Sequence, residues 1–135
     1  MKGKVIKKAP QKLVHISVEN HDEEWFTPRV PETLGPCEDE KSRRVCFAPS
    51  ICGAYKAIKD CSYWNTKFYV HVPYGLNDIV RRGKLYKPSD EQVYDVRETG
   101  EYWVRCRVKL KCIGRIHVWI DCHDNIRFRW IDRYE

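Results

Sequence analysis

The chain has 135 residues and a mass of 16.2 kDa, the size of one domain, and such a domain buries roughly two-thirds of the surface of its unfolded chain. Charged residues make up 33% of it and its mean hydropathy is -0.65, which is typical of a globular protein with a charged surface. No segment approaches the roughly 20 apolar residues of a transmembrane helix, and no apolar stretch follows the N-terminal lysines as in a secretory signal. We therefore expect a cytoplasmic protein with no membrane partner.

The net charge of +6 is distributed unevenly along the chain. Residues 1–12 carry +5 and no acidic side chain, residues 13–104 carry −3, and residues 105–135 carry +4. Chain ends are poorly ordered unless contacts tie them down, so the lysine-rich start predicts a flexible basic tail over residues 1–12. Residues 13–135 are expected to form a single domain.

The first part of this domain predicts a strand followed by a long loop. Residues 13–17 combine apolar and β-branched side chains, as short strands do. Residues 18–44 contain prolines and an acidic cluster but no periodicity. A loop of this length in a compact domain is usually functional or disordered, and its basic and aromatic run Trp25–Arg29 favours an ordered loop here.

A second strand and the main helix come next. Residues 44–48 predict a strand that Pro49 ends, and Ser50 is a good N-cap for a helix over residues 50–59. Apolar side chains recur in this segment at the spacing of a buried helix face, namely at Ile51, Ala54, Tyr55 and Ile58.

The rest of the chain predicts mostly β structure. Residues 68–72 alternate as a strand does, and residues 73–98 predict a loop with a helical turn at 77–82 and a short extended piece at 93–96. Three further alternating runs predict an antiparallel meander, at residues 102–108, 116–120 and 126–130. The expected fold class is therefore α+β, with small, mostly antiparallel twisted sheets and one main helix.

The seven cysteines predict neither a zinc site nor disulfides. They include no C-x-x-C pair, and the adjacent Cys122 and His123 have no neighbours that complete a tetrahedral site. An odd number of cysteines without a secretory signal suits a reducing compartment, so all are expected to be free thiols. A cysteine nucleophile paired with His71 or His117 is the alternative, although no local motif supports it.

The basic C-terminal third supports a nucleic-acid hypothesis. A nucleic-acid surface needs a basic face interleaved with aromatic rings. This segment contains both, namely Arg105, Arg107, Lys109, Lys111, Arg127 and Arg129 beside Trp103, Trp119 and Trp130. Strand positions that face water carry charge in most antiparallel sheets, and that simpler interpretation is favoured.

Three short segments suggest a family when they are taken in order. The first is His15-Ile16-Ser17 on a predicted strand, the second is Phe47-Ala48 followed by a helix with Tyr55, and the third is Glu101-Tyr102-Trp103-Val104. Together they resemble the His-x-Ser, Phe-Ala and Glu-Tyr-x-Val elements of the H-Y-E type of ADP-ribosyltransferase. This family includes the catalytic core of the poly(ADP-ribose) polymerases and of diphtheria-toxin-like enzymes.

The resemblance implies an ADP-ribosyltransferase-like domain that binds NAD and either transfers ADP-ribose or cleaves the nicotinamide–ribose bond. Glu101 would stabilise the positive charge that develops on the ribose, and His15 would hold the same sugar. Arg29 suits the pyrophosphate, because a guanidinium makes bidentate phosphate contacts. The expected NAD-binding set is His15, Ile16, Ser17, Arg29, Phe47, Ser50 and Tyr55, with Tyr102 as a further aromatic wall and with no metal.

The alternative is a non-enzymatic binding or inhibitor module of the phage or mobile-element type. Such a module would use the same scaffold to bind a host protein, a nucleotide or nucleic acid, because a fold does not fix a function. The enzymatic hypothesis instead implies a protein acceptor for the ADP-ribose. In addition, Ile16 stands where the family usually has glycine, so its side chain is expected to crowd the pocket.

Overall fold

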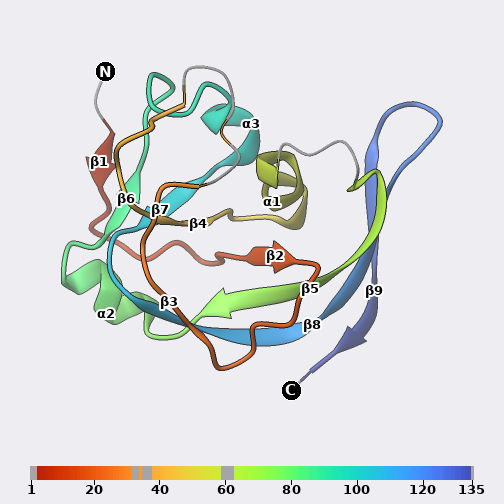
Figure 1. The fold of residues 1–135 in the computed structure, drawn as a ribbon, viewed down its shortest axis with the longest axis horizontal. Coiled ribbons are helices and arrows are strands. Elements are labelled where there is room, and N and C mark those ends of the chain that lie inside the picture. Colours follow the sequence, from red (N-terminus) through yellow and green to blue (C-terminus); the bar gives the residue numbers. More distant parts are fainter. Residues whose placement is uncertain (1–2, 32–33, 35–37, 59–62, 135) are drawn as a thin grey trace.

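The computed structural model describes residues 3–31, 34, 38–58 and 63–134, and Figure 1 shows their fold. The described residues form nine strands and three helices, and every strand pair in them is antiparallel. This confirms the predicted α+β class with mostly antiparallel sheets. No helix among the described residues has the length and apolar character that crossing a membrane requires.

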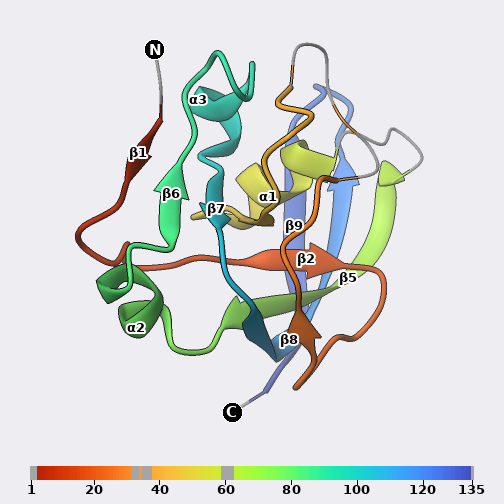
Figure 2. The same cartoon turned by 60° about the vertical axis from the view of Figure 1, so that its left-hand side comes forward.

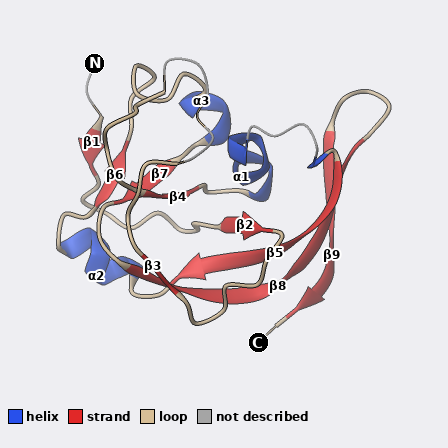
Figure 3. Cartoon of the chain, in the orientation of Figure 1, coloured by secondary structure: helices blue, strands red, loops and turns tan. Residues whose placement is uncertain are grey.

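The strands form two sheets, which Figure 3 shows in red. The first sheet has the order β1 (Lys4–Val5), β6 (Leu85–Lys87), β7 (Tyr102–Val104) and β4 (Val45–Phe47). The second sheet has the order β2 (His15–Ser17), β5 (Asn65–Pro73), β8 (Val108–Ile120) and β3 (Trp25–Phe26), with β9 (Ile126–Arg133) also paired to β8. The helices are α1 (Ile51–Ile58), α2 (Leu76–Arg81) and α3 (Val96–Thr99).

Two isolated bridges outside the named strands join segments of the two sheets, Val14 with Ala48 and, between the loop after β3 and the residue before β4, Arg29 with Arg44. Val14 and Ala48 exchange backbone hydrogen bonds of 2.7 and 2.9 Å, which places β2 beside β4 (Figures 1 and 2). Because Val14 directly precedes β2 and Ala48 directly follows β4, this bridge fixes how the first sheet sits on the second.

Alternation along the strands builds the core between the sheets. Helix α1 packs on the inner face of the second sheet, where its Ile51 and Ala54 join Phe68, Val70 and Ile116 in one buried cluster. A second buried cluster lies where the first sheet crosses α2 and the start of β8, and it includes Phe47, Ile79, Leu85, Val104 and Leu110. A third, smaller cluster consists of Tyr86, Val93, Val96 and Trp103.

The C-terminal meander is the clearest correction to the sequence expectation. Strand β7 belongs to the first sheet and β8 to the second, so the chain changes sheets at residues 105–107. Alternation continues through this point, because strands of either sheet have one buried and one exposed face. The predicted antiparallel pairing of residues 116–120 with 126–130 is confirmed by β8 and β9, whereas the run that begins at residue 102 was assigned to the wrong partner.

The predicted flexible tail is also wrong for the residues that the structure describes. Lys4 and Val5 pair with Lys87 and Tyr86 of β6, and the Ile6 N–H donates to the Leu85 carbonyl at 2.8 Å. Ile6 also packs against the second buried cluster, which holds the tail to the edge of the first sheet. Residues 1–2 lie outside the described residues.

Helix boundaries differ from expectation in the segment before β7. Helix α2 confirms the helical turn predicted at 77–82, but β6 lies in the predicted loop. Residues 93–95 form a bend and a turn, and Val96 begins α3, so this segment is not extended and the fold has more than the one predicted helix. Helix α1 confirms the main helix, although residue 59 lies outside the described residues.

Gly53 allows α1 to approach α3 closely. A Cβ atom at this position would lie 2.1 Å from the Thr99 carbonyl oxygen, far inside any real contact. We predict that Gly53→Ala lowers the free energy of unfolding by about 2 kcal/mol, because overpacking against backbone outweighs the roughly 1 kcal/mol that alanine gains in a helix. Urea-induced unfolding followed by circular dichroism measures this loss.

Gly75→Ala is the matched control for this substitution. Gly75 has φ of 67° but open space around its missing side chain, so only backbone strain of about 1 kcal/mol is expected there. If Gly53→Ala cost no more than Gly75→Ala, the close α1–α3 contact would not be a constraint on the fold.

Candidate functional site

A cavity of about 340 Å³ opens at the junction of the two sheets. Beyond the Val14–Ala48 bridge, β2 and β4 form no further backbone pairing among the described residues, and the cavity lies in this gap. Its walls combine apolar residues of α1 and the core with polar side chains from β2, the loop after β3, and the start of β7. The polar and aromatic lining includes His15, Phe26, Thr27, Arg29, Glu38, Arg44, Phe47 and Glu101.

His15 faces the cavity as a neutral imidazole. Its Nδ1 donates to the Cys46 carbonyl at 3.3 Å across the gap, so Nε2 is left as an acceptor. Removal from water, and then the neighbouring His71 ring, lower the pKa of His15 to about 4, although its bond to Cys46 opposes this shift. At neutral pH, His15 therefore offers a hydrogen-bond acceptor rather than a positive charge.

His71 holds His15 from behind and was not predicted as a site residue. It stands opposite His15 in the β2–β5 ladder, where its Nδ1 donates to the His15 carbonyl at 3.2 Å. Its Nε2 accepts the His21 N–H at 2.9 Å, which ties the loop after β2 to β5. Both ring nitrogens thus bond to backbone, and burial lowers the pKa of His71, so this side chain positions the strand.

The backbone of Ile16 faces the gap between β2 and β4. Val14 bonds to Ala48 on one side of the strand, and His15 pairs with β5 on the other. The alternation of an antiparallel strand then turns the Ile16 N–H and carbonyl towards β4. Its side chain packs in the same buried cluster as Val14 and Val70, and Ile16 is among the residues that line the cavity, so the expectation that its bulk crowds the pocket stays a prediction.

Glu101 is buried on the opposite wall, just before β7, with 3% of its surface exposed. Its side-chain Oε2 accepts the Trp103 Nε1–H at 2.6 Å, and its N–H donates to Thr99 Oγ1 at 3.2 Å. Gly100 makes the turn that delivers it, with φ of 69° and the Pro49 ring only 2.8 Å from where a Cβ would lie. Lys87 Nζ donates to the Glu101 carbonyl at 3.0 Å.

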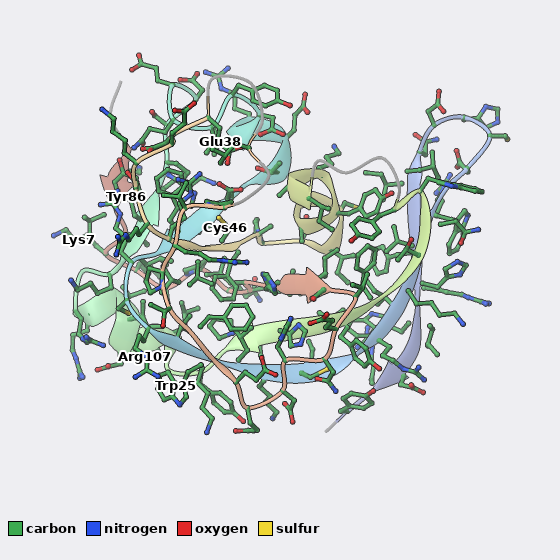
Figure 4. All side chains as sticks on the ribbon, viewed as in Figure 1. Lys7, Trp25, Glu38, Cys46, Tyr86 and Arg107 are labelled. Carbon is green, nitrogen blue, oxygen red and sulfur yellow. The ribbon has the colours of Figure 1, made fainter. Side chains whose placement is uncertain are left out.

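An ion pair between Arg44 and Glu38 forms the base of this wall. Arg44 Nη2 donates to Glu38 Oε2 at 2.9 Å, and the two side chains are 0% and 4% exposed. The Arg44 guanidinium also lies 4.1 Å over the Trp103 ring, the same ring that bonds Glu101. Arg44 Nε is buried and has no hydrogen-bond partner within the described part of the chain. Glu38 and Cys46, which both line the cavity, are labelled in Figure 4.

Aromatic and basic residues line the cavity around His15. Phe26 and Phe47 meet the His15 ring edge-on, with ring centroids 5.6 and 6.1 Å away. Arg29 lines the cavity and exchanges backbone hydrogen bonds of 3.1 and 2.9 Å with Arg44, so it is held beside the ion pair. Within the predicted loop, Trp25 and Phe26 instead form strand β3, and Phe26, Thr27 and Arg29 line the cavity.

The structure brings together some of the expected residues and separates others. His15, Ile16, Arg29, Phe47 and Glu101 line one cavity. His15 and Glu101 do not come from neighbouring strands, because β4 lies between β2 and β7.

Three expected ligand-binding residues lie elsewhere. Tyr55 packs edge-on against Phe68 in the core, and its hydroxyl donates to the Tyr63 carbonyl at 2.6 Å, so it is not the stacking ring. Ser17 Oγ pairs with His21 Nε2, and Ser50 Oγ accepts the Gly53 N–H as a helix cap. Tyr102 does not line the cavity either; Lys87 Nζ lies 4.3 Å over its ring.

Two of the described thiols, Cys46 and Cys112, are held in their neutral form. Burial, reinforced by Glu101, raises the pKa of Cys46 to about 12, and burial also raises the pKa of Cys112. His117 bonds to Asn65 and His71 to backbone, so the alternative of a cysteine–histidine pair has no support. Over the described ranges no group of three or more His, Cys, Asp and Glu residues is arranged to hold a metal ion, and the cysteines there are free. Cys37 and Cys61 lie outside those ranges.

Comparison with known proteins adds no assignment. No family model, curated protein or solved structure matches this chain.

The neutral state of His15 predicts an acid-sensitive fold. Because its folded pKa of about 4 lies below the usual 6.5, His15 stabilises the fold fully above about pH 6.5. That contribution is lost as the pH falls towards 4, since the unfolded chain then binds the extra proton. We expect it to be on the order of 3 kcal/mol.

Urea-induced unfolding at pH 7.5, 5.5 and 4.5 measures this contribution. His15→Asn keeps a donor for the Cys46 carbonyl but cannot titrate, so the loss between pH 7.5 and 4.5 should be smaller than in the wild type. An equal pH dependence in the two proteins would show that His15 is not held as a neutral ring.

Proposed function

We propose that the protein binds NAD in the cavity between His15 and Glu101 and cleaves its nicotinamide–ribose bond, on an ADP-ribosyltransferase-like fold. ADP-ribose then passes to water or to a nucleophile of a protein acceptor. The observation that carries the proposal is that a neutral imidazole and a buried carboxylate, contributed by different sheets, line one cavity. These are the two residues to which the motif resemblance gives the catalytic roles.

The cavity has the character of a small-molecule site and fits the nicotinamide riboside end of NAD. Its volume of about 340 Å³ falls at the lower end of the range typical of such sites, and its walls are mostly apolar with few polar groups. The Ile16 backbone faces the gap, where it suits the carboxamide of the nicotinamide. Arg44 Nε, which has no hydrogen-bond partner among the described residues, offers a further donor for a ligand oxygen.

Aromatic and basic groups suit the remaining parts of the ligand. Phe26 and Phe47 take the role of ring walls that was expected of Tyr55. Arg29 is placed for the pyrophosphate, because it lies beside the same cavity and carries a charge that complements phosphate. Thr27, which also lines the cavity, adds a hydroxyl near it.

Glu101 and His15 have distinct roles in the proposed reaction. The bond between ribose C1′ and the nicotinamide nitrogen breaks, its electron pair leaves with the nicotinamide, and positive charge develops on the ribose. The Glu101 carboxylate stabilises this charge, and the Trp103 indole keeps it in position before the reaction begins. His15 Nε2 accepts a hydrogen bond from a ribose hydroxyl. The nucleophile then forms its bond to C1′ and releases its proton to solvent.

Release of free nicotinamide from NAD tests the proposal. Glu101→Gln keeps an acceptor for the Trp103 indole but removes the charge, so NAD binding should change little while turnover falls about 100-fold or more. Glu98→Gln is the matched control, because Glu98 lies exposed on α3 three residues away. Its turnover should equal that of the wild type.

Two outcomes would change the functional assignment. If the wild type neither binds nor consumes NAD at millimolar concentration, the proposal is wrong. If it binds NAD but releases no nicotinamide, and Glu101→Gln leaves binding unaltered, the protein is a non-enzymatic nucleotide-binding module.

A further inference from the structure

The outer face of the second sheet carries rings and positive charges in register. Along β5, β8 and β9, the buried positions Phe68, Ile116 and Val118 face α1, so the intervening positions face outwards. The ladder pairs these outward positions in three rows, namely Asn65–Trp119–Arg127, Lys67–His117–Arg129 and Tyr69–Arg115–Asp132. Each row therefore combines one ring with at least one cation.

The basic side chains of this face either bond to an aspartate or make no ion pair with a described residue. Arg115 and Arg127 each bond to an aspartate at 2.8 Å through Nε, with Asp132 and Asp121 respectively, which orients their guanidinium planes. Lys67, Arg129 and Lys111 make no ion pair with any described residue. Positive charge thus exceeds negative charge on the face, and Figure 4 shows nitrogen-tipped side chains that project outwards from β8 and β9.

The aromatic rings of the face are accessible and close together. The His117 and Trp119 rings lie 5.2 Å apart with their planes tilted by 36°, and both side chains are half-exposed. By contrast, other residues of the basic C-terminal segment lie elsewhere: Trp103 is buried in the first sheet, Arg105 stacks on Tyr86 at 3.5 Å, and Trp130 packs inwards.

We propose that this outer face binds single-stranded nucleic acid, with bases stacked on Trp119, His117 and Tyr69 and phosphates held by Lys67 and Arg129. Base–aromatic stacking is sequence-tolerant, and a basic surface that follows the backbone supplies the rest of the affinity. The rows are about 7 Å apart along the strands, because successive outward residues are two positions apart. They present the rings one after another, as an extended strand of bases requires.

A single strand suits this face better than a duplex. Rings can stack only on bases that are unpaired and turned out, whereas a duplex offers its phosphates alone. The face also lies on the side of the second sheet opposite α1 and the His15–Glu101 cavity. Binding here is therefore independent of the proposed NAD chemistry, and either proposal stands if the other fails.

Fluorescence anisotropy with labelled 16-nucleotide RNA, DNA of the same sequence and the corresponding DNA duplex tests the proposal. The full chain should bind both single strands with micromolar affinity at 50 mM KCl and the duplex at least tenfold more weakly. Raising KCl to 200 mM should weaken single-strand binding about sevenfold, as neutralisation of two phosphates by Lys67 and Arg129 predicts. Trp119→Ala should weaken it about tenfold or more at either salt concentration.

Charge-reversal variants distinguish binding at this face from a general effect of the net charge of the molecule. Lys67→Glu with Arg129→Glu should weaken binding at least tenfold, whereas Arg82→Glu with Lys84→Glu makes the same change in charge after α2 and should leave it within about twofold. Thermal unfolding confirms that each variant is folded. The proposal is overturned if no single strand binds at 50 mM KCl, if the duplex binds as tightly, or if both double variants lose the same affinity.

Discussion

The arrangement of the candidate site depends on the buried ion pair between Arg44 and Glu38. Removing one partner of such a pair is strongly destabilising, because the other charge is then left in the interior, so both must stay in place. The guanidinium reaches beyond Glu38: Nη1 bonds the carbonyls of Asp39 and Ser42 at 2.9 and 2.8 Å, and the whole group lies over Trp103. Trp103 in turn bonds Glu101. The Arg44–Glu38 ion pair therefore helps to position the candidate catalytic carboxylate, although Glu101 is not a member of that pair.

Hydrogen bonds rather than an ion pair hold the opposite wall of the cavity. There the ring of His71 bonds to two backbone segments, the strand that carries His15 and the loop between β2 and β3. Both are hydrogen bonds of a neutral ring to backbone groups. The same region therefore has one wall fixed by a charged pair and one fixed by neutral imidazole bonds. The cavity between them exists because β2 and β4 pair only at Val14 and Ala48 and then separate. A site at the junction of two sheets is rigid on both sides yet open to a ligand.

Local patterns were sufficient to predict the strand with His15, the helix after Ser50 and the α+β class, because alternation, helical spacing and capping act over a few residues. They failed where tertiary context decides. Tyr55 has the spacing of a buried helix face, which does not distinguish a core ring from a ligand-stacking ring. Arg44 lies in a run of charged residues that is typical of a solvated surface, so its burial had no local signal. His71 was weighed only as the partner of a cysteine, since its support of His15 depends on the β2–β5 register.

The indole N–H resonance of Trp103 tests the central claim most directly, because this group bonds Glu101 on the cavity wall and is buried from solvent. In a titration followed by ¹H–¹⁵N correlation spectra, NAD should shift this resonance progressively to saturation. The resonance of Trp64, a ring 61% exposed outside the cavity, should stay in place. An unchanged Trp103 resonance at millimolar NAD would contradict the claim that the cavity between His15 and Glu101 receives this nucleotide.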